Sequence, residues 1–177
     1  AFTCADIGAN TVTLTVTDGS SNTATAVSSV TVADTTAPSA IAQNITVYLD
    51  GSGNASITAS DIDNGSTDNC SSVSLSASKM AFTCTDVGAN TVTLTVTDGS
   101  SNTATAVSTV TVADTTTPIA SAQNITVYLD GSGNTTITAS DIDNGSTDNC
   151  SSVSLSASKT AFTCSDIGTN SVTLTVT

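Results

Sequence analysis

The sequence repeats itself with a period of 80 residues, and this repetition limits the possible folds more than any other feature. Residues 1–80 align with residues 81–160 without a gap and differ at nine positions. A third copy begins at residue 161 and continues to Thr177. A period of 80 is too long for a solenoid unit and fits small domains in tandem. We therefore expect a string of similar domains, with both ends of the chain cut through a longer array.

Within each repeat the hydrophobic pattern has a period of two. In TVTLTVTD (91–98), Val92, Leu94 and Val96 alternate with threonines, which predicts a strand with one buried and one solvated face. The segments QNITVYLD, SSVSLSAS and TATAVSTVTVAD show the same alternation, and Asp50 followed by Gly51 predicts a hairpin turn. Six or seven short strands per repeat, with turns about every ten residues, predict an all-β fold of tandem immunoglobulin-like β-sandwich domains.

Proline indicates where one domain ends and the next begins. Each repeat has a single proline, Pro38 in DTTAP and Pro118 in DTTTP, and proline is tolerated in linkers and edges but not in a central strand. Short Thr/Pro linkers would then join the domains. The predicted division is a truncated repeat at 1–34, a complete repeat at 35–114 and a second truncated repeat at 115–177.

The five cysteines fit this division as staples within the domains. Cys70 would pair with Cys84 and Cys150 with Cys164, and the partner of Cys4 would lie before the first residue. A loop of about fifteen residues closed in this way contributes roughly 3 kcal/mol. Pairing of Cys4 with Cys70 is the second choice, because it places the proline segment in mid-domain. The alternative to any disulfide is that the cysteines are buried free thiols. A disulfide would imply an oxidising compartment outside the cytoplasm.

The charge of the chain excludes several classes of function. The net charge is −13, from fifteen aspartates and two lysines, and the chain has no His, Arg or Glu. Nucleic acids and anionic membranes bind basic surfaces, and no segment has the apolar length that spans a bilayer. Without the usual general bases and anion-binding side chains, we expect no enzymatic activity.

The motif DIDNGSTDNC (61–70), repeated at 141–150, offers oxygen ligands around a glycine, the chemistry that Ca²⁺ prefers. A second cation could lie at the domain boundaries, and the TDGS turns at residues 18 and 98 could reach the same end of the sandwich. The alternative is that these aspartates only form turns. The candidate metal ligands are Asp61, Asp63, Asp68, Asp141, Asp143, Asp148, Asp34 and Asp114.

The order of the segments from QNITVYLDGSGN through DIDNGSTDNC and FTC to TVTVADTTAP resembles the tandem HYR-like, immunoglobulin-like repeats of large surface adhesins of Bacteroidota, gliding adhesins included. The likeness covers essentially the whole chain. It implies a secreted, cell-surface stalk or filament. The DTT segments also resemble the Asp-Thr context in which Bacteroidota glycosylate secreted proteins, which makes Thr35 and Thr115 candidate O-glycan sites.

The expected function is therefore structural: a disulfide-stapled stalk, stiffened by Ca²⁺, that holds a binding tip away from the cell. Its partners would be neighbouring repeats of the same chain, other copies in a filament, and a surface or glycan ligand at the tip. The alternative is a module whose loops bind a carbohydrate or a protein directly. Tyr48 and Phe82 are the aromatic residues of the complete repeat, which is little for a binding recess.

Overall fold

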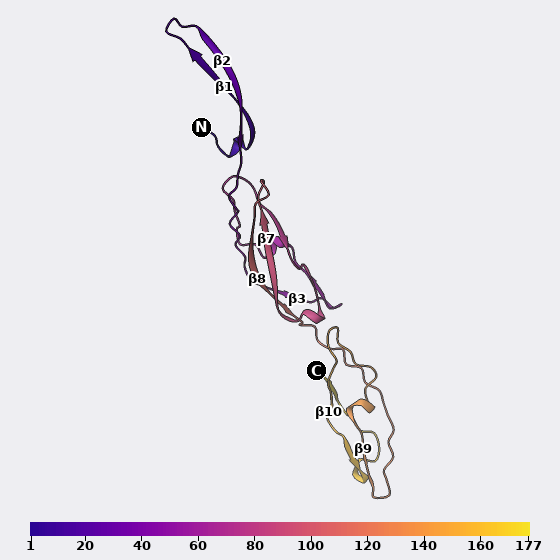
Figure 1. Ribbon diagram of the computed structural model, residues 1–177. Helices are drawn as coiled ribbons and strands as arrows, with labels where there is room; N and C mark the ends of the chain where they lie inside the picture. The colour runs from indigo at the N-terminus through magenta and orange to yellow at the C-terminus, as the bar shows by residue number, and fades with distance from the viewer. The chain divides into compact units, whose positions relative to one another are not determined.

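The computed structural model describes all 177 residues, and the fold is all-β. Helical structure is restricted to single turns of 3-10 helix (Figure 1). The strands are β1 (Gly8–Thr17), β2 (Thr23–Val32), β3 (Ile45–Tyr48), β4 (Asn54–Ser56), β5 (Ser74–Ala77), β6 (Ala81–Thr83), β7 (Gly88–Thr97), β8 (Thr103–Ala113), β9 (Asn134–Thr136), β10 (Leu155–Ala157), β11 (Ala161–Thr163) and β12 (Leu174–Val176). The 3-10 turns are η1 (Cys4–Asp6), η2 (Ala59–Asp61), η3 (Cys84–Asp86), η4 (Ala139–Asp141) and η5 (Cys164–Asp166).

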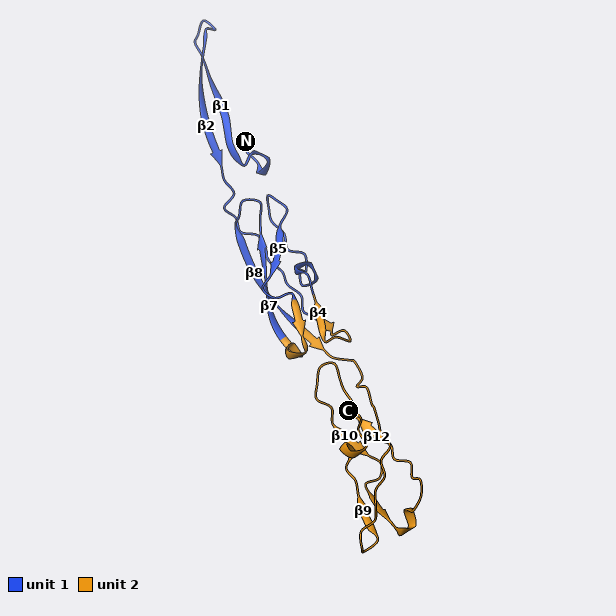
Figure 2. Cartoon of the chain, turned by 90° about the vertical axis from the view of Figure 1, so that its right-hand side faces the viewer, with its two compact units in different colours: residues 1–45, 57–80, 90–110 blue, residues 46–56, 81–89, 111–177 orange.

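The chain divides into two compact units, each made of several segments (Figure 2). Unit 1 consists of residues 1–45, 57–80 and 90–110, and unit 2 of residues 46–56, 81–89 and 111–177. The boundary between the units thus runs through the residues predicted to form the complete repeat. The division at 34/35 and 114/115 stays a prediction.

The first strands form an antiparallel hairpin, β1–β2, paired over ten residues from Gly8 opposite Val32 to Thr17 opposite Thr23. Asp18 holds the turn, because its carboxylate accepts hydrogen bonds from Ser20 N (2.9 Å) and Asn22 N (2.8 Å). The predicted strand and turn are both present here.

A four-stranded sheet with the order β3-β8-β7-β5 contains the long strands of the middle repeat. The predicted alternation is confirmed in β7: Val92, Leu94 and Val96 are fully buried, whereas Thr91 is exposed and the other threonines of the strand are half-buried. In β8 the buried face carries Ser108, Val110 and Val112. Threonine suits the solvated face because its branched side chain favours strand geometry.

The turn after β3 exists, but it does not make the predicted hairpin. Asp50 N donates to Asn54 O (2.8 Å) and Gly53 N donates to Asp50 O (2.9 Å). Nevertheless β3 lies beside β8, and β4 pairs with β6. The segment at residues 50–54 is therefore a corner at which the chain leaves one sheet and enters another.

The segments that follow the two prolines pair with the Asp-rich motifs. Ser39 and Ala42 form β-bridges with Thr67 and Asp63, and residues 119 and 122 form the same bridges with 147 and 143. Pro38, expected in a linker, is buried. The residues after each proline are thus part of the folded structure.

The disulfides connect cysteines 66 residues apart: Cys4 with Cys70, and Cys84 with Cys150. The predicted pairs Cys70–Cys84 and Cys150–Cys164 are wrong, and Cys164 is a free, exposed thiol. The second choice of the sequence reasoning, Cys4 with Cys70, is the pairing observed. Each bond lies within one compact unit, Cys4–Cys70 in unit 1 and Cys84–Cys150 in unit 2.

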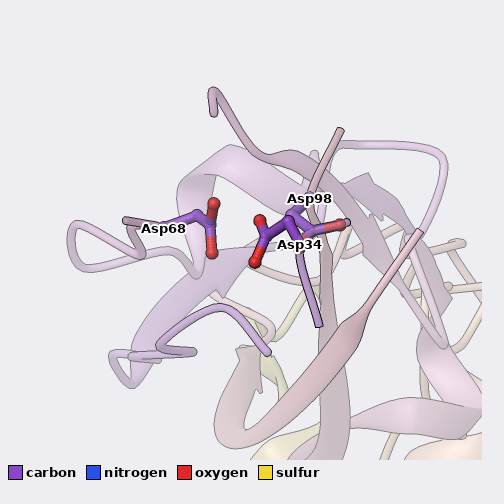
Figure 3. A group of neighbouring side chains, drawn as sticks. All are labelled: Asp34, Asp68 and Asp98. Carbon is purple, nitrogen blue, oxygen red and sulfur yellow. The ribbon is translucent and has the colours of Figure 1, made fainter. Parts of the chain in front are cut away.

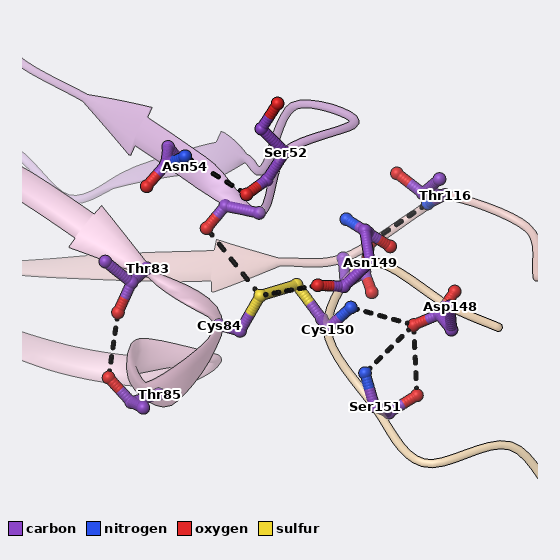
Figure 4. The surroundings of a disulfide bond; sticks show 12 residues. Ser52, Asn54, Thr83, Cys84, Thr85, Thr116, Asp148, Asn149, Cys150 and Ser151 are labelled. Carbon is purple, nitrogen blue, oxygen red and sulfur yellow. Dashed lines mark hydrogen bonds between the residues drawn. A yellow bond between two sulfur atoms is a disulfide. The ribbon is translucent and has the colours of Figure 1, made fainter.

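The strands between Cys70 and Cys84 explain why these two cysteines do not pair. A bond between them would suit a hairpin that returned the chain to its starting point. Instead β5 pairs with β7 and β6 pairs with β4, so the chain passes from one sheet to another between the two cysteines. Cys84 opens η3 directly after β6, where its sulfur meets Cys150 (Figure 4).

Two disulfides indicate an oxidising environment for this chain. A helix of the length and apolarity needed to span a bilayer is not found in the structure.

Glycine is required beside the second disulfide. A Cβ on Gly53 would lie 2.4 Å from Cys84 Sγ and 3.3 Å from Cys150 Sγ, and the residue has φ +76°. Both features disfavour any side chain, since positive φ strains L-residues. Gly51, two positions earlier, has open space around its Cα and no positive φ.

We predict that Cys84→Ser lowers the free energy of unfolding by about 2–5 kcal/mol, because the loop it opens is long. Denaturant melts measure the change, and Cys164→Ser is the matched control that should leave stability unaltered. Peptide mapping without reduction should recover Cys4–Cys70 and Cys84–Cys150. Recovery of Cys70–Cys84 would contradict the observed connectivity.

We further predict that Gly53→Ala slows or prevents formation of Cys84–Cys150, whereas Gly51→Ala does not. Thiol labelling after oxidative refolding measures this directly. The wild type and Gly51→Ala should expose one thiol per chain, that of Cys164, and Gly53→Ala should expose more. Equal labelling of the two variants would show that the close approach is unimportant.

Candidate metal centre

The first two aspartates of the motif DIDNGSTDNC are engaged locally. The Asp61 carboxylate accepts from Thr58 N (2.6 Å) and Thr58 Oγ1 (2.8 Å), and so caps η2. The Asp63 carboxylate accepts from Gly65 N (3.1 Å) and Ser66 N (3.2 Å). Asp61 and Asp63 are therefore turn-forming residues, and the structure does not bring them together with Asp68 as one ligand set.

These hydrogen bonds favour the ionised carboxylates. The backbone N–H of Thr58 lowers the pKa of Asp61, with a further contribution from the Thr58 hydroxyl. The Ser66 side chain lowers the pKa of Asp63. The second copy behaves alike: Thr138 lowers the pKa of Asp141, and the Ser146 side chain lowers that of the aspartate at position 143.

The third aspartate of the motif belongs to a different group. Asp34, Asp68 and Asp98 each offer a carboxylate oxygen, and these oxygens lie within 4.8 Å of one another (Figure 3). Asp34 follows β2, Asp68 lies in the loop before β5, and Asp98 follows β7. Two of the three, Asp34 and Asp68, were predicted ligands of separate sites. We call these three residues the aspartate triad.

Each member of the triad is held in place by local hydrogen bonds. Asp98 Oδ1 accepts from Ser100 N (2.9 Å) and Asn102 N (2.8 Å). The Asn102 side chain then connects two members, because Nδ2 donates to Asp98 Oδ2 (2.8 Å) and to the carbonyl oxygen of Asp34 (3.2 Å). Asn102, on the turn after β7, thus fixes Asp98 relative to Asp34.

Asp68 is oriented by the residues that follow it. Its Oδ2 accepts from Cys70 N (2.9 Å) and Ser71 N (3.1 Å). The hydrogen bond from Cys70 N is the largest of the causes that lower the pKa of Asp68. Since Cys70 is bonded to Cys4, the disulfide and the triad are two residues apart in the chain.

Two oxygens of the triad are buried and lack a protein partner: Asp34 Oδ2 and Asp68 Oδ1. A buried carboxylate oxygen without a donor is costly, and three like charges within 4.8 Å repel one another. A divalent cation bound between them would relieve both costs. Carboxylate oxygens are hard ligands of the type that Ca²⁺ binds, together with backbone carbonyls and water. The donor set and its unpartnered oxygens therefore fit Ca²⁺.

The corresponding residues one repeat later are Asp114 and Asp148. Asp114 Oδ1 accepts from Thr116 N (3.0 Å), and Asp148 Oδ2 accepts from Cys150 N (3.0 Å), as in the first copy. The position that corresponds to Asp98 would be 178, and the chain described here extends to Thr177. The structure brings together three candidate ligands only around Asp98.

Sequence reasoning placed Asp98 near the domain boundary but did not include it among the ligands. The TDGS motif could have indicated Asp98 as a ligand, because the hairpin places this turn directly after β7. The candidate O-glycan residues Thr35 and Thr115 are both exposed. Thr35 also lines a recess of about 250 Å³ beside Cys4 and Cys70.

No model of a known protein family matches this sequence, and no curated protein is significantly similar to it.

The lowered pKa values predict acid sensitivity. The folded-state pKa of Asp61 and of Asp141 lies below the ordinary value of 3.8. Each therefore contributes stability above that value, and the contribution is lost as the pH falls through the folded-state pKa. Thermal melting below pH 3.8 should show a smaller decrease for the double variant Asp61→Asn/Asp141→Asn than for the wild type. The same decrease in both would contradict the role of these caps.

Proposed function

We propose that this chain is a segment of a long extracellular adhesin or filament in which tandem immunoglobulin-like domains form a stalk. The observation that carries the proposal is the order of the disulfides along the chain. Elements also recur at the sequence period: β4 and β9, η2 and η4, and β6 and β11 each lie 80 residues apart. This recurrence supports tandem domains, and the disulfides support a location outside the cytoplasm.

The disulfides shorten the covalent path along the chain. A pulling force applied at the two ends crosses from Cys4 directly to Cys70, follows residues 70–84, and crosses from Cys84 to Cys150. The residues between the members of each pair lie outside this path. In each 80-residue period only the segment between one disulfide and the next carries the force.

The lengths involved differ severalfold. A fully extended chain spans at most about 3.6 Å per residue, so 80 residues could extend to about 290 Å and the segment 70–84 only to about 50 Å. A structure with this connectivity resists elongation even where its strands unfold. Limited extension is useful in a stalk that must hold a tip at a fixed distance under load. By contrast, the predicted pairing of Cys70 with Cys84 would leave most of each 80-residue period free to extend.

We propose that Ca²⁺ binds the aspartate triad and stiffens this connection. Asp68 is hydrogen-bonded to the backbone of Cys70, which is bonded to Cys4. A cation bound by Asp34, Asp68 and Asp98 would therefore hold three separate segments together next to this disulfide. Extracellular calcium modules bind with dissociation constants of about 10⁻⁴–10⁻³ M, and calcium outside the cell is abundant enough for this range. The cation would serve a structural purpose, with no chemistry of its own.

Single-molecule pulling tests the stalk. With handles at residues 1 and 177, the oxidised chain should extend only through residues 1–4, 70–84 and 150–177, roughly a quarter of the contour length of the reduced chain. The reduced chain is the internal control. Full extension of the oxidised chain would contradict the proposed stalk function.

Thermal melting with Ca²⁺ and with chelator tests the triad. At a calcium concentration a hundredfold above the dissociation constant, the stabilisation should be about 2.7 kcal/mol, and it should disappear in Asp98→Asn. Asp18→Asn is the matched control, since Asp18 makes the same turn contacts without the neighbouring carboxylates. A melting temperature that Ca²⁺ does not change would leave the triad without a metal.

A further inference from the structure

The dipeptide Asn-Gly occurs twice in the chain, at Asn64–Gly65 and at Asn144–Gly145. Both pairs lie in the motif DIDNGSTDNC, outside the aspartate triad. The side chains of Asn64 and Asn144 are exposed, and their amide groups make no hydrogen bond in the structure. In each pair the side-chain carbonyl carbon is therefore accessible to a nucleophile.

The reaction open to such a pair is deamidation. The backbone nitrogen of the glycine loses its proton to hydroxide and attacks Cγ of the asparagine. The Cγ–Nδ2 bond then breaks, and the leaving nitrogen takes a proton from water and departs as ammonia. Water opens the resulting cyclic imide and leaves either aspartate or isoaspartate. The reacting groups are neighbours in one chain, so no entropy is lost in bringing them together, and glycine has no side chain to obstruct the attack.

The backbone at this place requires glycine. The first of the two glycines has φ +85° and the second has φ +82°, a conformation that strains residues with a side chain. The β-bridges of Ala42 with Asp63 and of Ser39 with Thr67 enclose three residues of the motif, 64–66, but only two of the facing segment, 40–41. The glycine thus lies in a bulge, and the bulge imposes the residue that leaves the asparagine most reactive.

A carboxylate holds the nitrogen that would attack. Asp63 Oδ2 accepts a hydrogen bond from Gly65 N (3.1 Å), and Asp63 Oδ1 accepts from Ser66 N (3.2 Å). The second copy repeats both contacts, because Gly145 N and Ser146 N each lie 3.1 Å from the carboxylate oxygens of residue 143. The proton that must leave before the attack is therefore engaged in both copies.

The carboxylate opposes the reaction in two ways. A hydrogen bond to a charged acceptor stabilises the protonated form of the nitrogen. Once the proton is lost, the negative nitrogen faces the negative carboxylate, which disfavours the ionised form further. The side chain of Ser66 lowers the pKa of Asp63, so the carboxylate carries its charge at neutral pH.

Formation of isoaspartate would disturb the fold here, since it adds a carbon atom to the backbone at position 64. The backbone is held on both sides of that position. Asn64 N donates to Ile41 O (2.9 Å), and the buried Ser66 Oγ accepts from Ile41 N (3.0 Å). A longer main chain cannot keep both contacts with Ile41, so the facing segment would lose part of its attachment to the motif.

We propose that Asn64 and Asn144 are deamidation sites that the carboxylates of Asp63 and Asp143 keep unreacted. The second aspartate of the motif then has a role that needs no metal, in agreement with its position outside the triad. This inference depends neither on the calcium site nor on the stalk function.

The test uses the oxidised full chain with Asp63→Ser. Serine also forms turns with the following backbone but carries no charge. After incubation at neutral pH, peptide mapping by mass spectrometry measures aspartate and isoaspartate at each Asn-Gly pair. Deamidation at Asn64 should be about tenfold or more faster than in the wild type, because the nitrogen loses a charge-assisted hydrogen bond. Asn144 keeps its carboxylate and is the reference within the same molecule, so it should react at the wild-type rate.

Ser66→Ala separates the effect of the carboxylate from that of loop mobility. It removes the contacts of the Ser66 hydroxyl with Ile41 but leaves the Asp63 carboxylate on Gly65 N, so Asn64 should react at close to the wild-type rate. Wild-type chain in denaturant covers the case in which a variant misfolds, and both Asn-Gly pairs should react faster there than in the folded chain. Equal rates at Asn64 in folded and denatured wild type would overturn the proposal, as would equal rates in Asp63→Ser and Ser66→Ala.

Discussion

The rest of the structure depends on the disulfide between cysteines 66 residues apart. At Cys84–Cys150, the motif DIDNGSTDNC (141–150) positions the cysteine through hydrogen bonds. The Asp148 carboxylate accepts from Cys150 N and Ser151 N and so orients the cysteine (Figure 4). Asn149 Nδ2 donates to Asp50 O (3.1 Å). On the other side, Gly53 leaves room for the sulfur. A motif that resembles a metal loop thus serves largely to position a covalent bond.

The copy of this motif at residues 61–70 contains both Cys70, which forms the disulfide with Cys4, and Asp68, a member of the aspartate triad. One oxygen of Asp68 binds the backbone N–H of Cys70, and the other oxygen is buried in the triad without a partner. Loss of the disulfide would therefore loosen the carboxylate, and neutralising the carboxylate would loosen the cysteine.

Most strands could be predicted from the sequence, because the alternation of apolar and polar residues indicates them. The exception is residues 125–128, which repeat the sequence of β3 but do not form a strand. In β7 the valines and leucine are buried as the period of two requires. The disulfide pairing could not be predicted, since it depends on which strands become neighbours. The turn at residues 50–54 has hairpin chemistry, yet β3 and β4 enter different sheets. For the same reason Asp61 and Asp63 make local turn contacts while Asp68 lies beside Asp34 and Asp98, although Asp61, Asp63 and Asp68 lie within eight positions.

Burial is a property of neighbours, and the two copies of one strand pair demonstrate this. Val92, Leu94 and Val96 are fully buried in β7, while the identical residues of β1 are largely exposed. A two-stranded hairpin gains little from its own pairing and is marginal in water. Its apolar face becomes stabilising only beside a sheet edge such as the one that β3 gives β8. The Cys4–Cys70 disulfide tethers the segment that leads into the β1–β2 hairpin to folded structure at Cys70.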